Sequence, residues 1–238
     1  MSVDVLVIAA HPDDAEMTVG GTLAKLADRG YTTAIVDMTR GEMGSRGTAE
    51  QRDEEAAAAA KVLNVSHRVN LDLGDGLLEN TLKNRVAVIE QIRHFRPKLV
   101  IAAYWEDLHP DHRATGYIVR DIMYPCGFAK FPAKGEPHRP KEFLFFMQHW
   151  GFEPSFIVDI TGYHEQKLDS VRCYDSQLYQ PGENDKLVWI SDPNFLARLE
   201  ARARTYGTQI RTEFGEPLLS CRPVPIDDPM ATYKPFFD

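Results

Sequence analysis

The first half of the chain alternates short apolar runs with segments of helical spacing. Strand-like, β-branched runs lie at residues 3–10, 32–38, 67–71 and 98–104, and the helical segments lie between them at 16–29, 49–63 and 82–95. A strand that is followed by a helix and a second strand requires a right-handed crossover, and such crossovers build a parallel sheet. We therefore predict an α/β fold with a mostly parallel central sheet and helices on both faces.

The second half of the chain is less regular. It predicts a helix after His112 that runs to about Tyr124, a loop over 125–140, strands at 142–148 and 156–160, and helices at 162–174 and 193–208. The tail beyond residue 208 contains five prolines, so we expect it to be mostly extended or irregular. Because neither an internal repeat nor a long linker divides the sequence, residues 1–238 are predicted to form one domain.

Charge and hydropathy disfavour several classes of function. The formal net charge is −8, which disfavours a general nucleic-acid partner. No apolar stretch approaches the roughly 20 residues that span a bilayer, and no basic region with a long apolar segment marks a secretory signal. The three cysteines are scattered, without the spacing of a disulfide scaffold. We expect a cytoplasmic protein with no membrane and no nucleic acid as partner.

A cluster of titratable residues, His11, Asp13, Asp14 and Glu16, directly follows the first predicted strand. In open α/β sheets this edge binds ligands. Like charges at such short spacing cost stability unless a positive charge lies among them, and a divalent cation would supply it. His11 and Asp14 can face one point, which leaves Asp13 beside the metal, where a general base takes a proton from water. The alternative is an N-cap on the following helix.

A second cluster, His109-Pro110-Asp111-His112, follows the fourth predicted strand. Pro110 suits the first position of a helix, and histidines three residues apart share a helix face. One ring can bind a metal while the other stays free, and Asp111 can hydrogen-bond one imidazole and fix its tautomer. The remaining histidines, His149 among them, are predicted singly to be ordinary core or surface residues.

Together the two clusters could supply a histidine–carboxylate–histidine metal site with a spare carboxylate and a spare imidazole, as a metal-dependent hydrolase requires. Nitrogen and oxygen ligands suit both Zn²⁺ and Fe²⁺. A nucleotide-binding module is one alternative, but the first turn lacks the glycine-rich loop that such a module needs. A non-catalytic metal-binding protein is another, but it would not need the spare groups.

The two clusters resemble those of the LmbE-like, or PIG-L, deacetylases. Further matching motifs are Thr39-Arg40-Gly41-Glu42, Gly47-Thr48, Arg52-Asp53-Glu54-Glu55-Ala56 and Leu71-Asp72-Leu73-Gly74-Asp75-Gly76. The resemblance covers about residues 3–175 and is greatest to the bacillithiol-biosynthesis deacetylases, which remove acetyl from N-acetylglucosaminyl-malate. It implies a Rossmann-like three-layer sandwich, a zinc-type site and a homo-oligomer, often a hexamer.

The resemblance also implies roles for individual residues. The metal ligands would be His11, Asp14 and His112, the base would be Asp13, and a protonated His109 would stabilise the tetrahedral intermediate. Arg52 would bind the substrate, although an ion pair with Glu54, Glu55 or another acid of its own helix is the alternative.

The predicted substrate is a small N-acetyl amino sugar, with N-acetylglucosaminyl-malate as the first choice and another N-acetyl sugar or thiol conjugate as the alternative. Leu108 occupies a position where some relatives have a polar or basic side chain, which bears on malate recognition. The loop 41–47 is either a flap over the site or a plain surface loop. The pair Gly20-Gly21 predicts a close approach of the backbone to another element.

Overall fold

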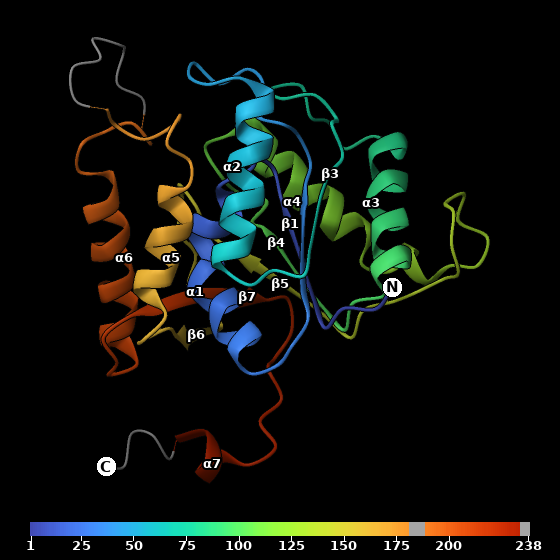
Figure 1. Cartoon of the computed structure of the whole chain (residues 1–238). Coiled ribbons are helices and arrows are strands. Elements are labelled where there is room, and N and C mark those ends of the chain that lie inside the picture. The colour runs from blue at the N-terminus through green and yellow to red at the C-terminus, as the bar shows by residue number, and fades with distance from the viewer. Residues whose placement is uncertain (181–188, 234–238) are drawn as a thin grey trace.

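The computed structural model describes residues 1–180 and 189–233, and Figure 1 shows the whole chain. The seven strands of its sheet are β1 (Val5–Ala9), β2 (Thr33–Asp37), β3 (His67–Asn70), β4 (Leu99–Ala103), β5 (Glu142–Phe146), β6 (Phe156–Asp159) and β7 (Gly215–Ser220). They lie in the order β3-β2-β1-β4-β5-β7-β6. The first five are parallel, and β7 is antiparallel to both β5 and β6. The predicted α/β fold with a mostly parallel sheet is confirmed.

Helices cover both faces of the sheet (Figure 1). They are α1 (Asp14–Asp28), α2 (Ala49–Val62), α3 (Leu82–Phe95), α4 (Pro110–Ile122), α5 (His164–Arg172), α6 (Phe195–Gln209) and α7 (Pro229–Tyr233), with a 3-10 turn at Pro125–Gly127. One core lies between the sheet and α3 and α4, and a second lies between the sheet and α1. Helix α5 packs on α1, and α2 packs on α5. No helix in the described ranges has the length and apolarity needed to cross a membrane.

The central strands are apolar throughout because both of their faces are buried. In β1, Leu6 and Ile8 belong to the core under α3 and α4, whereas Val5, Val7 and Ala9 belong to the core under α1. The three predicted helices of the first half lie within two residues of their observed bounds. Helix α2 begins at a capping box, in which the Thr48 side chain and Gln51 satisfy each other's backbone N–H groups.

The fold places the two titratable clusters side by side. Strands β1 and β4 are parallel neighbours, with Val5 opposite Leu99 and Ile8 opposite Ala102. The chain leaves β1 toward β2 on one side and β4 toward β5 on the other, so the strand order reverses between them. A crevice outside the strand ends at such a switch point is the usual ligand site of an open α/β sheet.

Strand β7 corrects one expectation, because part of the proline-containing tail forms an interior strand. Interior strands rarely contain proline, which has no N–H to give to the ladder. Pro217 lies opposite Ile157 of β6, but β5 pairs with β7 only from Leu218 to Ser220. Pro217 therefore lies past the end of the β5 ladder, where its missing N–H costs no bond.

Helix α1 is broken at Val19, whose φ of −128° and ψ of 18° are not helical. The Glu216 carboxylate of β7 caps the second half of the helix, accepting hydrogen bonds from Gly21 N at 3.0 Å and Thr22 N at 2.7 Å. A Cβ on Gly21 would come within 2.8 Å of Ile160 Cδ1. The predicted close approach at the glycine pair is thus confirmed, and β7 fixes the helix that begins with Asp14.

Candidate metal centre and active site

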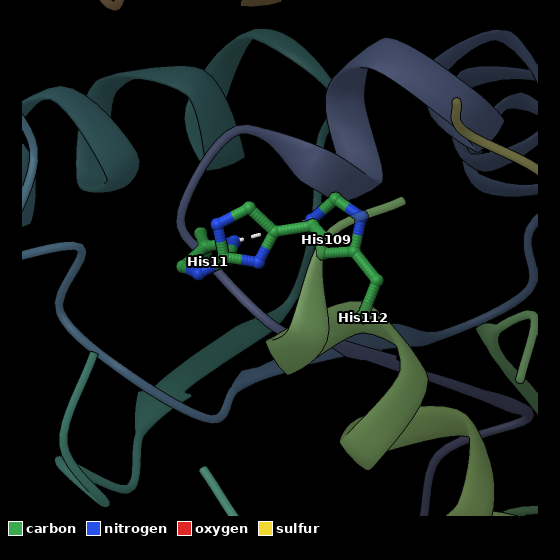
Figure 2. Close-up of side chains that lie close together, drawn as sticks. All are labelled: His11, His109 and His112. Carbon is green, nitrogen blue, oxygen red and sulfur yellow. Dashed lines mark hydrogen bonds between the residues drawn. The ribbon is translucent and has the colours of Figure 1, made fainter. Parts of the chain in front are cut away.

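Three histidines from distant parts of the chain meet at the ends of β1 and β4 (Figure 2). The ring centroids of His11 and His109 lie 4.7 Å apart, and those of His11 and His112 lie 5.2 Å apart. His11 follows β1, whereas His109 and His112 belong to the first turn of α4. The structure thus brings the two clusters into one site.

Two ring nitrogens and the two oxygens of one carboxylate face one another at similar distances. His11 Nδ1 lies 3.3 Å from His112 Nε2, Asp14 Oδ1 lies 3.4 Å from His112 Nε2, and Asp14 Oδ2 lies 3.5 Å from His11 Nδ1. A tetrahedral metal with bonds of about 2.0–2.1 Å needs ligand atoms about 3.3–3.4 Å apart. The spacing of His11, Asp14 and His112 therefore fits a single ion.

Outer carboxylates hold the far side of both rings. His11 Nε2 lies 3.1 Å from Asp75 Oδ1 and 3.2 Å from Asp111 Oδ2, and His112 Nδ1 lies 3.0 Å from Asp107 Oδ1. A ring N–H that donates to a carboxylate leaves the opposite nitrogen free to bind a metal. Asp111 is thus placed against His11, while His112 has Asp107 as its partner.

The same carboxylates favour positive charge at this site. Burial opposes protonation of His11, but Asp111, Asp14 and Asp75 outweigh it and hold the pKa of His11 well above its usual value. Burial also opposes protonation of His112, but Asp14 and Asp107 raise its pKa to about 9. A cation bound between the rings would take the place of these protons. The donor set and its charge both fit a divalent metal ion.

Asp13 lines the same cavity as His11, Asp14 and His112, and its carboxylate is paired with Arg52. It occupies the N-cap position of α1, yet its side chain makes no capping bond, and its φ of 110° is in the left-handed region. Such backbone strain is found at functional sites more often than elsewhere. Burial raises the pKa of the Asp13 carboxyl to about 7, and the Arg52 charge opposes this rise. A carboxyl group with this pKa can accept and return a proton near neutral pH.

His109 is the N-cap of α4, and its Nδ1 accepts the backbone N–H of Asp111 at 3.2 Å. Any proton on the neutral ring is therefore on Nε2. Burial lowers the pKa of His109, and the positive charges of His11 and His112 act in the same direction. A neutral His109 ring can therefore donate from Nε2, while the protonated His109 that the resemblance implies stays a prediction.

Arg52 is buried rather than extended into open space, with only 5% of its surface exposed. Its Nη2 donates to Asp13 Oδ2 at 2.8 Å and to the Pro12 carbonyl oxygen, and its Nη1 donates to Gln177 Oε1 at 3.3 Å. The ion-pair partner of Arg52 is thus Asp13 and not an acid of its own helix, and its role in binding the substrate stays a prediction. Arg52 lines the cavity and holds the Asp13 carboxylate in place.

The site opens into a cavity of about 450 Å³. Its lining residues include His11, Asp13, Asp14, Met43, Ser45, Arg52, Asp75, His109, His112, Gln148, His149, Gln177 and Trp189. Met43, Gly44 and Ser45 of the 41–47 loop contribute to this wall, and the Met43 N–H donates to Asp75 Oδ2 at 2.9 Å. The loop thus borders the site.

Sequence reasoning missed four polar residues of this site. Gln148 Nε2 donates to Asp14 Oδ1 at 2.6 Å. Asp107 Oδ1 lies 2.8 Å from His149 Nδ1 and 3.0 Å from His112 Nδ1. Asp75 belongs to one of the family motifs, and Asp107 is two residues before His109, so both had a signal. Gln148 and His149 follow β5, the parallel strand next to β4. Their position after a parallel strand end was the only sequence signal that could have placed them at the site.

Comparison with known proteins gives one family. The sequence model described as PIG-L, GlcNAc-PI de-N-acetylase, matches residues 6–123, which include both titratable clusters. Diacetylchitobiose deacetylase of Thermococcus kodakarensis is 32% identical over 188 residues, which are 73% of this chain and 69% of that protein.

Two solved structures share the fold. A conserved protein from Thermus thermophilus superposes with a TM-score of 0.86 at 35% identity, over 94% of this chain and 97% of that chain. The N,N'-diacetylchitobiose deacetylase of Pyrococcus horikoshii, in complex with an inhibitor, gives a TM-score of 0.81 at 27% identity, over 93% of this chain and 84% of that chain. The likeness in both cases extends over nearly the whole chain.

Proposed function

The chain belongs to the PIG-L family of GlcNAc-PI de-N-acetylases, and on this premise we propose that it is a metal-dependent hydrolase that removes the acetyl group from an N-acetyl amino sugar. The observation that carries the proposal is the triangle of His11 Nδ1, Asp14 and His112 Nε2 with the Asp13 carboxylate beside it. One similar protein is a diacetylchitobiose deacetylase, and this name describes an enzyme that acts on an N-acetylated sugar.

The metal ligands in this proposal are His11, Asp14 and His112, and the ion is Zn²⁺ or Fe²⁺. When bound, a divalent ion lowers the pKa of water and polarises a carbonyl oxygen. The donor set supports this assignment because it combines two neutral imidazole nitrogens with one carboxylate, which is a usual set for a catalytic ion with an open position.

Asp13 acts as the general base. It takes a proton from the attacking water as the bond to the acetyl carbon forms, and it gives that proton to the sugar nitrogen as the carbon–nitrogen bond breaks. The pKa of about 7 suits both transfers. Arg52 holds the carboxylate by the Nη2 bond and keeps the base oriented. The products are acetate and a free amino sugar.

His109 stabilises the negative charge that grows on the acetyl oxygen. Its Nε2–H is the donor, because Nδ1 is occupied by the Asp111 backbone N–H. The N-terminus of α4 starts at the same residue and favours negative charge there. Removal of one such donor typically costs about 10²–10³-fold in turnover.

The finer assignment is N-acetylglucosaminyl-malate as a step of bacillithiol biosynthesis, with another N-acetyl sugar or a thiol conjugate as the alternative. All of these substrates present the same acetamide, so the residues above serve each of them equally. The cytoplasmic location and the homo-oligomer that the resemblance implies stay predictions.

The test combines metal analysis of the purified protein with acetate release from N-acetylglucosaminyl-malate and from diacetylchitobiose. We expect about one divalent ion per chain and acetate from at least one of the substrates. Asp13→Asn should keep the metal and lose about 10²–10⁴-fold in turnover. His112→Ala should lose the metal, whereas the control His94→Ala, at an exposed histidine of α3, should keep both metal and activity.

Two outcomes would contradict the proposal. Metal and activity that survive in His112→Ala would show that the ligand assignment is wrong. A metal-loaded protein that releases no acetate from any N-acetyl sugar would show that the reaction is wrong, whatever the ligands.

A further inference from the structure

The loop 41–47 lies directly against the buried guanidinium of Arg52. Gly41 and Gly47 have φ of 67° and 71°, in the left-handed region that favours glycine. A Cβ on Gly41 would come within 2.6 Å of Arg52 Cζ. A Cβ on Gly47 would come within 2.6 Å of Ser176 Oγ. The loop is therefore fitted closely against both of these side chains.

One side chain, that of Gln177, joins this loop to Arg52. Gln177 follows α5 and is only 5% exposed. Its Oε1 accepts a hydrogen bond from Arg52 Nη1 at 3.3 Å. Its Nε2 donates to the Arg46 carbonyl oxygen of the loop at 2.8 Å and to Ser176 Oγ at 2.9 Å. Because a guanidinium only donates and a carbonyl oxygen only accepts, a single orientation of the amide satisfies both neighbours.

Further contacts fix the segment that carries Gln177. The backbone N–H and the Oγ of Ser176 both donate to the Glu55 carboxylate of α2, at 2.7 and 2.8 Å. Arg46 Nε of the loop donates to the Ser176 carbonyl oxygen at 3.2 Å. The loop, α2 and the chain after α5 are thus tied together around the Gln177 amide.

The two ends of this amide face different parts of the site. Arg52 donates to Asp13 Oδ2 at 2.8 Å, so the bond from Gln177 Oε1 to Arg52 bears on the orientation of the proposed general base. The loop contributes Met43 and Ser45 to the cavity wall, so the bond from Gln177 Nε2 bears on the surface that the substrate meets.

We propose that Gln177 is a positioning residue that holds the general base and the substrate-binding loop in place together, the base through Arg52 and the loop through the Arg46 carbonyl oxygen. This inference rests on the proposed function. The Gln177 carbonyl oxygen restrains the guanidinium that orients Asp13, so it acts on the rate of the chemical step. The Gln177 amide nitrogen holds the loop against the cavity, so it acts on substrate binding.

Two variants of Gln177 separate these contacts in the metal-loaded enzyme, assayed with diacetylchitobiose and N-acetylglucosaminyl-malate. Gln177→Met loses both hydrogen bonds, so kcat should fall about 10–100-fold through the misplaced base, and KM should rise through the released loop. In Gln177→Glu the carboxylate still accepts from Arg52 but has no N–H for the Arg46 carbonyl oxygen. This variant should therefore show the higher KM with a much smaller loss of kcat.

Hydrogen exchange of the backbone amides reports on the loop independently of the reaction. Residues 41–47 should exchange at least about tenfold faster in both variants, whereas β1 and β4 should exchange as in the unchanged protein. The metal content should stay at about one ion per chain. The matched control is Gln180→Met, because the Gln180 side chain bonds to Asp175 and is not among the described residues that line the cavity. This control should change neither the kinetics nor the exchange.

Three results would overturn the inference while the proposed function stands. They are an unchanged kcat in Gln177→Met, an unchanged exchange rate of residues 41–47 in that variant, and a kcat in Gln177→Glu as low as in Gln177→Met. A metal-loaded, unchanged protein that releases acetate from neither substrate would instead overturn the proposed function, and the exchange measurement would still test the contact between Gln177 and the loop.

Discussion

Addition of Zn²⁺ to the metal-free protein at pH 7 is expected to release close to two protons per site. The structure raises the pKa of His112 to about 9 and that of His11 well above its usual value, so both rings are protonated before metal arrives. His11 Nδ1 and His112 Nε2 must lose these protons to bind an ion. With two protons displaced, the apparent affinity should rise by about 10²-fold per pH unit, or by up to about 10⁴-fold between pH 6 and pH 8.

Calorimetric titration in buffers of different ionisation enthalpy counts these protons directly. Because Asp13 also titrates near pH 7, the experiment is best repeated in Asp13→Asn, where about two protons should still be released. The number should fall above pH 9, where His112 is already neutral. A release below about half a proton at pH 7 would refute the reasoning, since it would mean that the carboxylates do not hold protons on the two rings.

Four further predictions concern the side chains of His112, Gln148, Arg52 and Glu216. The raised pKa of His112 stabilises the metal-free protein, and this contribution is fully present below pH 6.5. On the order of 3 kcal/mol of the free energy of unfolding is lost as the pH rises through about 9. In denaturant titrations, the free energy of unfolding of His112→Gln should therefore depend less on pH than that of the unchanged protein. Gln148→Leu removes the donor to the ligand carboxylate and should weaken metal binding about 10–100-fold in a chelator competition. Arg52→Ala removes the charge that lowers the pKa of Asp13, so the acidic limb of the kcat/KM profile should move to higher pH; an unmoved limb would contradict the pairing. Glu216→Ala leaves the buried Lys167 ammonium unpaired and should destabilise the fold by about 3–5 kcal/mol in thermal unfolding. The control is Glu142→Ala, which removes a more exposed ion pair with Arg222 and should destabilise the fold less.

The first half of the fold was predictable because its pattern is local. Strands β1, β2 and β4 are largely apolar runs, and helices α2 and α3 begin at the side-chain caps of Thr48 and Thr81. The meeting of His11 with His109 and His112 followed from one topological rule about parallel strand ends. Strand β7 was missed because its proline is a local signal against a strand, and only the short β5 ladder makes Pro217 acceptable.

The site was less predictable where partners come from distant segments. Gln148 and His149 follow β5 without a motif of their own, and only the folded chain shows that Gln148 reaches the Asp14 carboxylate. Sequence spacing offered Arg52 the acids of its own helix, whereas in the fold its partner is Asp13, 39 residues earlier. Local patterns thus nominate chemical groups, and tertiary contacts decide which of them act on each other.

The break in α1 has a consequence for the order in which the protein is made. The backbone N–H groups of Gly21 and Thr22 are satisfied by Glu216, which is synthesised nearly two hundred residues later. While the ribosome is still translating the middle of the chain, the helix that begins with Asp14 lacks its internal cap. The first segment to be synthesised is therefore among the last to form all of its hydrogen bonds. A nascent chain that stops short of β7 contains the metal-binding residues but lacks the Glu216 contacts that hold α1.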